Sequence, residues 1–429
     1  MRCILASLSL LLSVSLPTAC LASETPPLGD AAKTWAVGIG KGAVGTAEKR
    51  EGKWTFAMNG SPFAEGHAAV APERVLFEIG SISKVFTAVL LADAVNGGKL
   101  ALDDTLAKRF PDLTFQDPNV GAITLERLAT HSSCLPRLPS NMMNADAADP
   151  YAQYDDKALM EYLAAAHLGA QPPCGADYSN LGFGILGVVV ERAQAKPWAR
   201  LVQEKIAGPL GMVDTAQGLS ADQQSRFALP WVGDEPAQPW TFKAMAGAGA
   251  LRSTLADMSR FADALQAGAK GPLAATWALI SADRVDMPSA GGKIGLAIFH
   301  VKDHGEEMYT HDGGTGGYRS NLRVRPVSGR CDIILASNSA AAPEAWIASW
   351  QGAGEPAMAR TAVSLSTEVL DEYTGVYNID ASGRFTIVRH GDGLVARLTG
   401  QGFVPIFASA KDAFFYKVVD AQLLFRRGA

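Results

Sequence analysis

The order of strand and helix patterns constrains the fold of this chain more than any other feature. Strand patterns at 34–42 (TWAVGIGKG) and 53–60 (KWTFAMNG) predict an N-terminal hairpin. A helical middle follows, after which strand patterns return at 293–301, 306–313, 318–326 and 331–338. Strands at both ends of a helical segment predict one antiparallel sheet assembled from both ends of the domain. We therefore expect an α+β fold in which helices flank the sheet and form a second, helical lobe.

The helical middle is predicted from apolar periodicity and capping residues. The first helix starts at Ser81, is apolar on every side, as buried helices are, and ends near Asn96-Gly97-Gly98. A Thr254–Asp257 pair has the spacing of a capping box and starts the last helix. The remaining helices are expected at 123–131, 156–168, 181–195 and 198–213.

The composition changes from about residue 367. Six short segments then alternate apolar and polar residues, with turn residues between them: 372–379, 384–390, 393–399, 404–409, 413–419 and 422–427. This pattern predicts a small all-β module, of a size that is marginal in isolation. We expect residues 1–22 to be a signal peptide, 23–360 the main domain and 367–429 the C-terminal β module.

The first 22 residues, MRCILASLSLLLSVSLPTACLA, have the charge, apolar stretch and small residues of a secretory signal. They predict cleavage near Ala22 and a periplasmic or secreted protein. Acylation of Cys20 is the alternative, although Pro17 stands where a lipoprotein signal has an aliphatic residue. No later stretch is apolar for eighteen residues or more, so we expect no membrane span.

Charge and cysteine content restrict the partners. The chain has 38 basic and 43 acidic residues, a net charge of −5 and no basic run, which argues against nucleic-acid binding and favours a small-molecule substrate. Outside the signal, Cys134, Cys174 and Cys331 remain, an odd number that predicts one disulfide and one buried thiol. Neither the scattered histidines nor the cysteines have the spacing of a metal site, and we expect no metal and no cofactor.

The segment LFEIGSISKVF, residues 76–86, places Ser81 three residues before Lys84 at the start of the buried helix. Positions three apart lie on one helix face, so the lysine amine can reach the serine hydroxyl. The alternative is that Ser81 only caps the helix and Lys84 is an ordinary helical lysine, which would give the same sequence pattern. Lysine, however, is rarely buried without a partner, and the hydroxyl of Ser81 would be that partner if the lysine serves as its base.

Two further segments can supply the proton donor and the ligand contacts that an acyl transfer needs. One segment is Tyr178-Ser179-Asn180, directly before the apolar helix at 181. Tyr178 could relay a proton if a nearby ammonium lowers its pKa, and the Asn180 amide offers both a hydrogen-bond donor and an acceptor. THDGGTGGYRS, residues 310–320, puts five glycines beside a histidine, which indicates backbone that a ligand approaches closely. A loop tyrosine, a capping asparagine and a Gly-rich hairpin turn are the structural alternatives.

SISK, YSN and HDGGTGG, in this order, resemble the three motifs of the penicillin-recognising serine hydrolases, in the branch of class C β-lactamases and serine D-Ala-D-Ala carboxypeptidases. Three flanking segments are similar as well: LATHSSCLPRLP, PPCGADYSNLGFGILG and AGALRSTLADMSRF. The likeness covers roughly 35–340. It implies a β-lactamase/transpeptidase-like fold and a secreted hydrolase of β-lactam or D-Ala-type amide bonds that forms an acyl-enzyme.

The resemblance also implies a role for each motif residue. Ser81 would be the acylated nucleophile, Lys84 the amine that shares its proton, and Tyr178 the residue that shuttles a proton to the leaving group. Substrate contacts would come from Asn180 and from three residues of the last motif, His311, Gly313 and Gly314. The backbone N–H groups of Ser81 and Gly314 would form the oxyanion hole.

This sequence departs from the family pattern at three places. His311 stands where efficient class C lactamases have a lysine, and Asp312 replaces a hydroxyl residue, so the grip on a substrate carboxylate is weakened. Cys134 and Cys174 each replace a glycine, in two segments that the family fold brings close to the active site. The resemblance therefore implies a Cys134–Cys174 disulfide and leaves Cys331 as the free thiol.

Two other functions remain compatible with these residues. A carboxylesterase on the same fold is favoured by His311 and Asp312, because a neutral ester needs no cationic clamp. A non-catalytic penicillin-binding protein is disfavoured by the intact Ser81, Lys84 and Tyr178. An α/β-hydrolase is disfavoured, because the chain has no G-x-S-x-G segment.

Overall fold

The computed structural model describes residues 25–142, 146, 148–288, 291–351, 362–380, 383–398, 404–416 and 422–425. The expected signal peptide, 1–22, lies outside the described residues. No helix of the described ranges is long and apolar enough to cross a bilayer.

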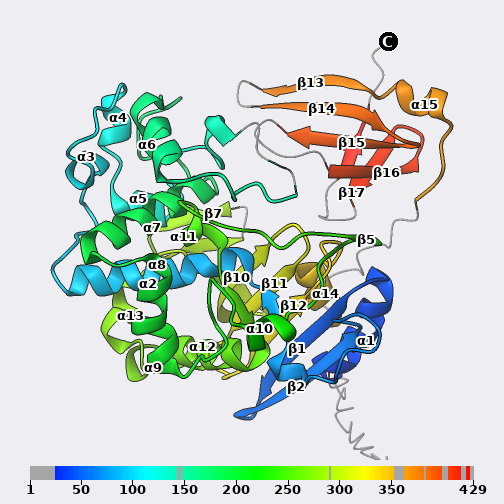
Figure 1. Ribbon diagram of the computed structural model, residues 1–429, viewed down its shortest axis with the longest axis horizontal. Coiled ribbons are helices and arrows are strands. Elements are labelled where there is room, and N and C mark those ends of the chain that lie inside the picture. Colours follow the sequence, from blue (N-terminus) through cyan, green and yellow to red (C-terminus); the bar gives the residue numbers. More distant parts are fainter. Residues whose placement is uncertain are drawn as a thin grey trace, which may run out of the picture.

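An antiparallel eight-stranded sheet forms the centre of the main domain (Figure 1), in the order β2-β1-β12-β11-β10-β9-β8-β7. The strands are β1 Ala43–Arg50, β2 Lys53–Gly60, β7 Val285–Met287, β8 Gly292–Ile294, β9 Phe299–Asp303, β10 Glu306–Gly314, β11 Arg319–Val324 and β12 Cys331–Ala336. Strand β1 of the N-terminal hairpin pairs with β12, the last strand of this sheet along the chain, with Val44 opposite Ala336. The α+β prediction, with one sheet built from both ends of the domain, is thus confirmed.

The predicted strand at 34–42 is wrong. Residues Leu28–Ile39 form helix α1, and the first strand of the hairpin is β1. Trp35, Val37 and Ile39 alternate as in a strand, but the residues that become buried are Leu28, Ala32, Ala36 and Ile39, at helical spacing. Together with α14 (Pro343–Trp350), α1 covers one face of the sheet, and α12 (Leu255–Ala267) covers the other.

The predicted single strand at 293–301 is divided into two. β8 ends at Ile294 and β9 begins at Phe299, and the four residues between them turn the chain so that the two strands pair with each other. Ala297 in this turn has a positive φ of 66°, and its N–H donates to the carbonyl of Ala129 in the helical lobe. A tertiary contact is therefore made in the middle of a segment whose only polar side chains are Lys293 and His300.

The longest of the other helices are α2 (Ser83–Asn96), α7 (Asn180–Gln194), α6 (Asp156–Ala165) and α13 (Ala274–Ser281); the short ones are α3 Leu106–Arg109, α4 Pro118–Gly121, α5 Leu125–Ala129, α8 Trp198–Val202, α9 Gly208–Leu210, α10 Ala221–Ser225 and α11 Ala246–Gly249. Single-turn 3-10 segments lie at Pro72–Arg74, Gly80–Ile82, Ser140–Met142 and Gly268–Lys270, and Gln203–Ala207 is a π-turn. The helices predicted from Ser81 and at 123–131, 156–168 and 181–195 are present to within a few residues, and the one predicted at 198–213 is divided into α8, a π-turn and α9. Helices α3, α4, α10, α11 and α13 were not predicted. Two small ladders pair β3 (Leu76–Glu78) with β6 (Arg252–Thr254) and β4 (Trp231–Val232) with β5 (Glu235–Pro236).

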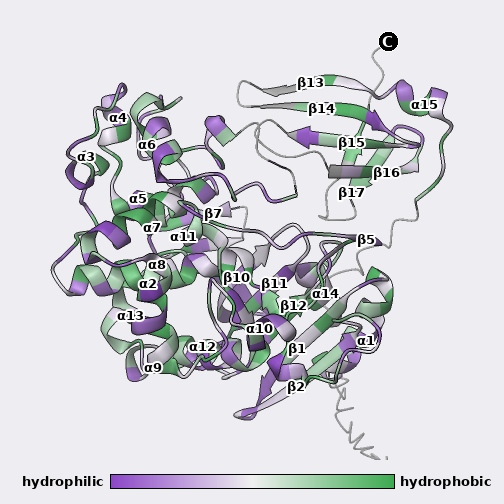
Figure 2. Ribbon diagram, viewed as in Figure 1, coloured by the Kyte–Doolittle hydropathy of each residue, from purple (hydrophilic) through white to green (hydrophobic). Residues whose placement is uncertain are grey.

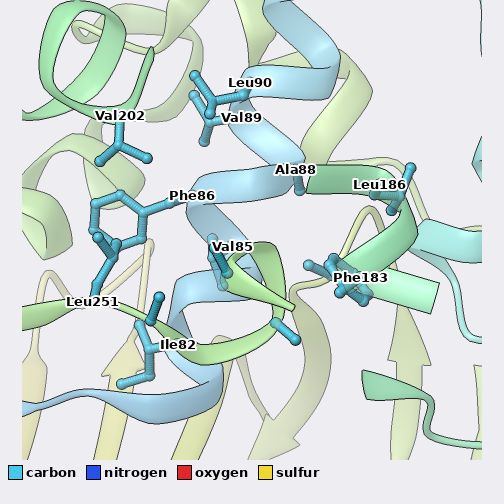
Figure 3. Close-up of a cluster of buried hydrophobic side chains, with 14 of the residues drawn as sticks. Ile82, Val85, Phe86, Ala88, Val89, Leu90, Phe183, Leu186, Val202 and Leu251 are labelled. Carbon is cyan, nitrogen blue, oxygen red and sulfur yellow. The ribbon is translucent and has the colours of Figure 1, made fainter. Parts of the chain in front are cut away.

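Helix α2 lies inside the molecule rather than on its surface. Figure 3 shows Phe86 between Val202 and Leu251, while Phe183 and Leu186 of α7 approach the helix from its other side. All of these side chains are completely or almost completely buried. A helix enclosed on every side has little freedom to shift, so its first turn is a rigid support for the residues that it carries.

A second, six-stranded sheet follows the main domain in the order β13-β14-β15-β16-β17-β18 (Figure 1). Helix α15 (Thr367–Asp371) precedes its strands, which are β13 Gly375–Asp380, β14 Gly383–His390, β15 Gly393–Leu398, β16 Val404–Ala410, β17 Ala413–Tyr416 and β18 Gln422–Leu424. Each of the six overlaps a segment predicted as a strand, and the ends differ by at most three residues. Figure 2 shows both hydrophobic and hydrophilic residues along these strands. The buried cluster around Ile387, Ile406 and Phe414 consists only of residues from this part of the chain.

Candidate active site

The Ser81–Lys84 pair lies where the central sheet meets helix α2. Ser81 is in the 3-10 turn Gly80–Ile82, directly after β3, and Lys84 is in the first turn of α2. Gly80 has a positive φ of 49°, and a Cβ there would come within 2.6 Å of the Gly314 nitrogen. The turn therefore requires glycine, both for its conformation and for its close approach to β10.

Lys84 is completely buried, and its amine is surrounded by three polar atoms. The Nζ lies 3.0 Å from Ser81 Oγ, 2.8 Å from Asn180 Oδ1 and 2.7 Å from the carbonyl oxygen of Ala248. Two of these atoms can only accept hydrogen bonds, whereas the hydroxyl can donate. A neutral amine fits this arrangement, since its two hydrogens satisfy the acceptors and its lone pair is left for the Ser81 hydroxyl.

The electrostatics of Lys84 favour the same protonation state. Burial, and after it the positive charge of Arg137, hold the pKa of Lys84 well below its usual range, and the negative charge of Asp312 opposes them only in part. The amine therefore loses its proton more readily than that of an exposed lysine, which is what a base at neutral pH requires.

Tyr178 lies beside this pair, at the end of the loop that leads into α7. Its ring centroid is 4.9 Å from Lys84 Nζ and 4.4 Å from the ring of His131. The next residue, Ser179, caps α7 by accepting from the Gly182 N–H at 3.0 Å, and its own N–H donates to His131 Nδ1 at 3.1 Å. The cap thus holds the tyrosine at a defined place at the N-terminus of a buried helix.

The expected lowering of the Tyr178 pKa is wrong. Burial, and then the charge of Asp312, raise the pKa of Tyr178, and the hydrogen bond with Ser81 and the charge of Arg137 offset this only in part. The expectation depended on a nearby ammonium, whereas burial holds the pKa of Lys84 itself well below its usual range. Tyr178 is therefore a protonated phenol at neutral pH and can act as a proton donor.

The Cys134–Cys174 disulfide is present, with a Cα–Cα distance of 5.3 Å, and Cys331 is a buried free thiol. The bond joins the loop after α5 to the loop before Tyr178. Two backbone hydrogen bonds connect the same loops: Cys174 N–H donates to the carbonyl of Ser132 and Asp177 N–H to that of His131. The approach to Tyr178 is therefore fixed both covalently and by hydrogen bonds.

Asn180 is the first residue of α7, and both ends of its amide are engaged. Its Oδ1 accepts from Lys84, and its Nδ2 donates to the hydroxyl of Tyr151 at 3.2 Å. Tyr151 in turn stacks on Phe242 with ring centroids 4.8 Å apart. Tyr151 could not be identified from the sequence, because no motif links it to Asn180 and only the fold brings the two together.

His311 and the glycines after it form a strand edge that is unpaired on one side. β10 pairs with β11 as far as Gly314 opposite Arg319, but with β9 only as far as Thr310 opposite Phe299. On the β9 side, residues 311–314 are therefore free of ladder partners. A ligand can approach such an edge and form strand-like hydrogen bonds with it.

The His311 ring is buried and lies 6.5 Å, centroid to centroid, from the ring of Tyr178. Its Nδ1 is 2.6 Å from the carbonyl oxygen of Asp312, so Nδ1 carries the hydrogen and donates it. Burial lowers the pKa of His311 to about 4, against the opposing charge of Asp312. The imidazole is consequently neutral at physiological pH and does not replace the lysine cation of the related motif.

Gly313 allows β10 to pack directly on the turn that carries Ser81. A Cβ at Gly313 would lie 2.1 Å from the carbonyl oxygen of Ile79 and 3.0 Å from the Ser81 nitrogen. The structure thus brings together all the residues selected from the sequence: Ser81, Lys84, Tyr178, Asn180, His311, Gly313 and Gly314. Among the described residues, no group of three or more His, Cys, Asp or Glu side chains could hold a metal ion.

A sheet covered by helices on both faces, with a serine hydroxyl against the amine of a buried lysine, defines the class of serine hydrolases with a β-lactamase-like architecture. The crystal structure of a β-lactamase/D-alanine carboxypeptidase from Pseudomonas syringae has this fold, with a TM-score of 0.64 and 22% identity over 76% of this chain and 99% of that one. The chain belongs to the beta-lactamase family, whose model matches residues 45–351.

Two relatives illustrate the range of the likeness. The D-alanyl-D-alanine-carboxypeptidase/endopeptidase AmpH of Escherichia coli K12 is 35% identical over 185 residues, which cover 43% of this chain and about half, 47%, of AmpH. Penicillin-binding protein 4* of Bacillus subtilis 168 is 24% identical over 401 residues, 85% of this chain and 86% of that protein. The chain is thus a serine β-lactamase-family hydrolase related to D-Ala-D-Ala carboxypeptidases and β-lactamases.

Proposed function

We propose that this protein hydrolyses β-lactam or D-Ala-type amide bonds through an acyl-enzyme on Ser81. The observation that supports this most directly is the buried amine of Lys84, 3.0 Å from Ser81 Oγ and held between two obligate hydrogen-bond acceptors. Such an amine can take the hydroxyl proton as the oxygen attacks a carbonyl carbon. The relatedness to AmpH and to penicillin-binding protein 4* agrees with this substrate class.

The proposed reaction divides the proton transfers between two residues. Ser81 Oγ forms a bond to the carbonyl carbon while its proton passes to Lys84, and the N–H groups of Ser81 and Gly314 stabilise the oxyanion. The carbon–nitrogen bond then breaks as Tyr178 donates its phenolic proton to the leaving nitrogen. The proton that Ser81 lost restores the phenol, and a water molecule later hydrolyses the ester to free Ser81.

A carboxylesterase is the second candidate, and the state of His311 favours it. Because the imidazole is buried and neutral and is followed by Asp312, this strand edge offers no cation to a substrate carboxylate. A simple ester does not need one. The same Ser81, Lys84 and Tyr178 would carry out this reaction.

Three substrates separate these functions. We expect fluorescent penicillin to label the wild type, and nitrocefin or a D-Ala-D-Ala peptide to be turned over more efficiently than p-nitrophenyl acetate. Efficient hydrolysis of the ester alone would favour the carboxylesterase, and labelling without any turnover would indicate a penicillin-binding protein. Ser81→Ala should abolish labelling and hydrolysis, and Lys84→Ala should do almost the same, since the two residues act as a unit. Substantial hydrolysis by Ser81→Ala would refute the mechanism.

We further propose that the protein is exported, with cleavage near Ala22. The disulfide between Cys134 and Cys174 supports an oxidising compartment. Cell fractionation and N-terminal sequencing of the mature protein test this proposal. A mature N-terminus at Cys20 carrying a lipid would instead show lipoprotein processing, and recovery of the full-length chain in the cytoplasm would contradict export.

A further inference from the structure

The charges around the proposed site are distributed unusually for an enzyme that binds a carboxylate. On the strand edge, His311 is neutral, and the carboxylates of Asp312 and Glu344 lie near each other. Burial, and then the charge of Asp312, raise the pKa of Glu344, which also accepts a hydrogen bond from Asn321 Nδ2 at 3.1 Å. The neighbouring Arg319 directs its Nη1 to the carbonyl oxygens of Thr315 and Tyr318. This edge is thus poorly suited to an anion.

Arg137 brings a permanent positive charge to the opposite side of the site. Its backbone carbonyl accepts the N–H groups of Asn180 at 3.0 Å and Leu181 at 3.2 Å, which fixes its loop against the start of α7. Its guanidinium carbon lies 5.0 Å from the centroid of the Tyr178 ring. The residue is therefore anchored through its main chain while its side chain extends over the proposed proton donor.

The charge of Arg137 acts on the site, and no acidic side chain of the described residues forms an ion pair with it. After burial, which is the largest influence on each group, the charge of Arg137 adds to the lowering of the pKa of Lys84 and His131 and partly offsets the rise in the pKa of Tyr178 and Tyr151. The side chain is exposed, and within the described ranges its guanidinium has no hydrogen bond or ion pair. Its planar set of donors remains available to a ligand and matches the two oxygens of a carboxylate.

We propose that Arg137 is a specificity-determining residue that binds a carboxylate on the leaving group of the substrate. This inference rests on the function proposed above, in which Tyr178 protonates the leaving atom. A guanidinium that packs on the ring of the proton donor lies on the leaving-group side. An amino-acid leaving group carries its carboxylate only one carbon away from that atom. Arg137 would thus supply, from the helical lobe, the anion contact that the strand edge lacks.

If Arg137 only packs on Tyr178, its removal should affect substrates with and without a leaving-group carboxylate equally. Matched pairs of substrates separate this possibility from carboxylate binding. The probes are phenyl esters of one acyl group, with and without a meta-carboxylate on the leaving phenol, which an amidase or an esterase of this family can cleave. A D-Ala-D-Ala peptide and its C-terminal amide form a second pair. In each pair only the charge on the leaving group changes.

We expect the wild type to prefer the carboxylate-bearing member of each pair. Arg137→Gln should reduce this preference, measured as the ratio of the two kcat/KM values, by about 10- to 100-fold, which is the loss expected for one charge-assisted hydrogen-bonded contact. The reduction should lie mainly in KM. Arg137→Lys should retain part of the preference. A loss common to both substrates reports only the influence of Arg137 on Lys84 and cancels in the ratio.

Arg192 provides the matched control. It is an exposed arginine whose guanidinium carbon lies 4.8 Å from the ring centroid of Phe110, outside the cluster. Arg192→Gln removes the same charge and should leave the ratio unchanged. Equal kcat/KM losses for both members in Arg137→Gln, or no preference in the wild type, would overturn the role of Arg137. A wild type that cleaves no probe and is not labelled by penicillin would instead refute the proposed function, and the inference with it.

Discussion

Removing the disulfide should destabilise the protein by a predictable amount and leave its chemistry in place. The double variant Cys134→Gly, Cys174→Ser opens a loop whose ends are 40 residues apart. For a loop of this length, the entropy that the bond removes from the unfolded chain corresponds to about 4 kcal/mol. Glycine is the replacement at position 134 because the backbone φ there is 64°, which other residues adopt only with strain.

The measured loss should be smaller than this upper value. The Cys174–Ser132 and Asp177–His131 backbone hydrogen bonds keep the two loops together in the folded state, so no native contact besides the bond is lost. We expect the free energy of unfolding to fall by about 2–4 kcal/mol, the usual range for a native disulfide. The folded variant should still be acylated, because Ser179 continues to hold Tyr178 through its bonds to His131 and Gly182.

Urea titration followed by tryptophan fluorescence tests this prediction, with the reduced wild type as the control. Reduction opens the same loop without a sequence change, so the reduced wild type and the double variant should unfold at similar urea concentrations. A double variant within about 0.5 kcal/mol of the oxidised wild type, the range of neutral surface substitutions, would refute the loop-entropy reasoning. A stable but inactive variant would show that the disulfide itself positions Tyr178.

Three further predictions concern charge and domain organisation. Burial depresses the pKa of Lys84 in the folded state, so between that pKa and about 10.4 the unfolded chain binds more protons than the folded one. Lys84 therefore makes the free energy of unfolding increase with pH over this interval. Denaturation at pH 7–10 should show a smaller increase for Lys84→Met than for the wild type. Truncation after residue 366 should leave acylation intact, since the buried cluster of the C-terminal sheet is separate; a folded but inactive truncation would contradict this. His311→Lys should raise kcat/KM for carboxylate-bearing β-lactams relative to simple esters, and an unchanged ratio would show that this position does not face the substrate carboxylate.

Local patterns predicted the fold well where one physical requirement dominated. Helix α2 was predictable because a segment that is apolar on every side can only be buried, and the strands from β13 to β18 because each alternates between turns. The sequence of α1 fits both a strand periodicity and a helix periodicity, and packing against β1 favoured the helix. The turn between β8 and β9 is stabilised by the hydrogen bond from the Ala297 N–H to the Ala129 carbonyl, a contact that no local sequence pattern can predict.

The candidate site shows a similar division. The motifs identified the residues that converge, since their order and spacing are specific. Burial and long-range charge determined the rest. The pKa of Tyr178 rises rather than falls because its burial and the charge of Asp312 outweigh the groups that lower it. Tyr151 joins the site from a loop without any motif, and nothing in the segment LATHSSCLPRLP marks Arg137 as a charge at the site. Such properties depend on how the whole chain packs, so a sequence can name the groups without giving their protonation states.

The pairing of β1 with β12 also determines when this molecule can fold. Val44 and Ala336 are neighbours in the sheet although 292 residues separate them in the chain. At about 5–20 residues per second, a ribosome needs about 15–60 s to synthesise that interval. During this time the hairpin of β1 and β2 has an unpaired edge, and the turn that carries Ser81 lacks the strand on which it packs. The sheet that carries the strand edge at Gly313 and Gly314 is therefore completed only after β12 has been made.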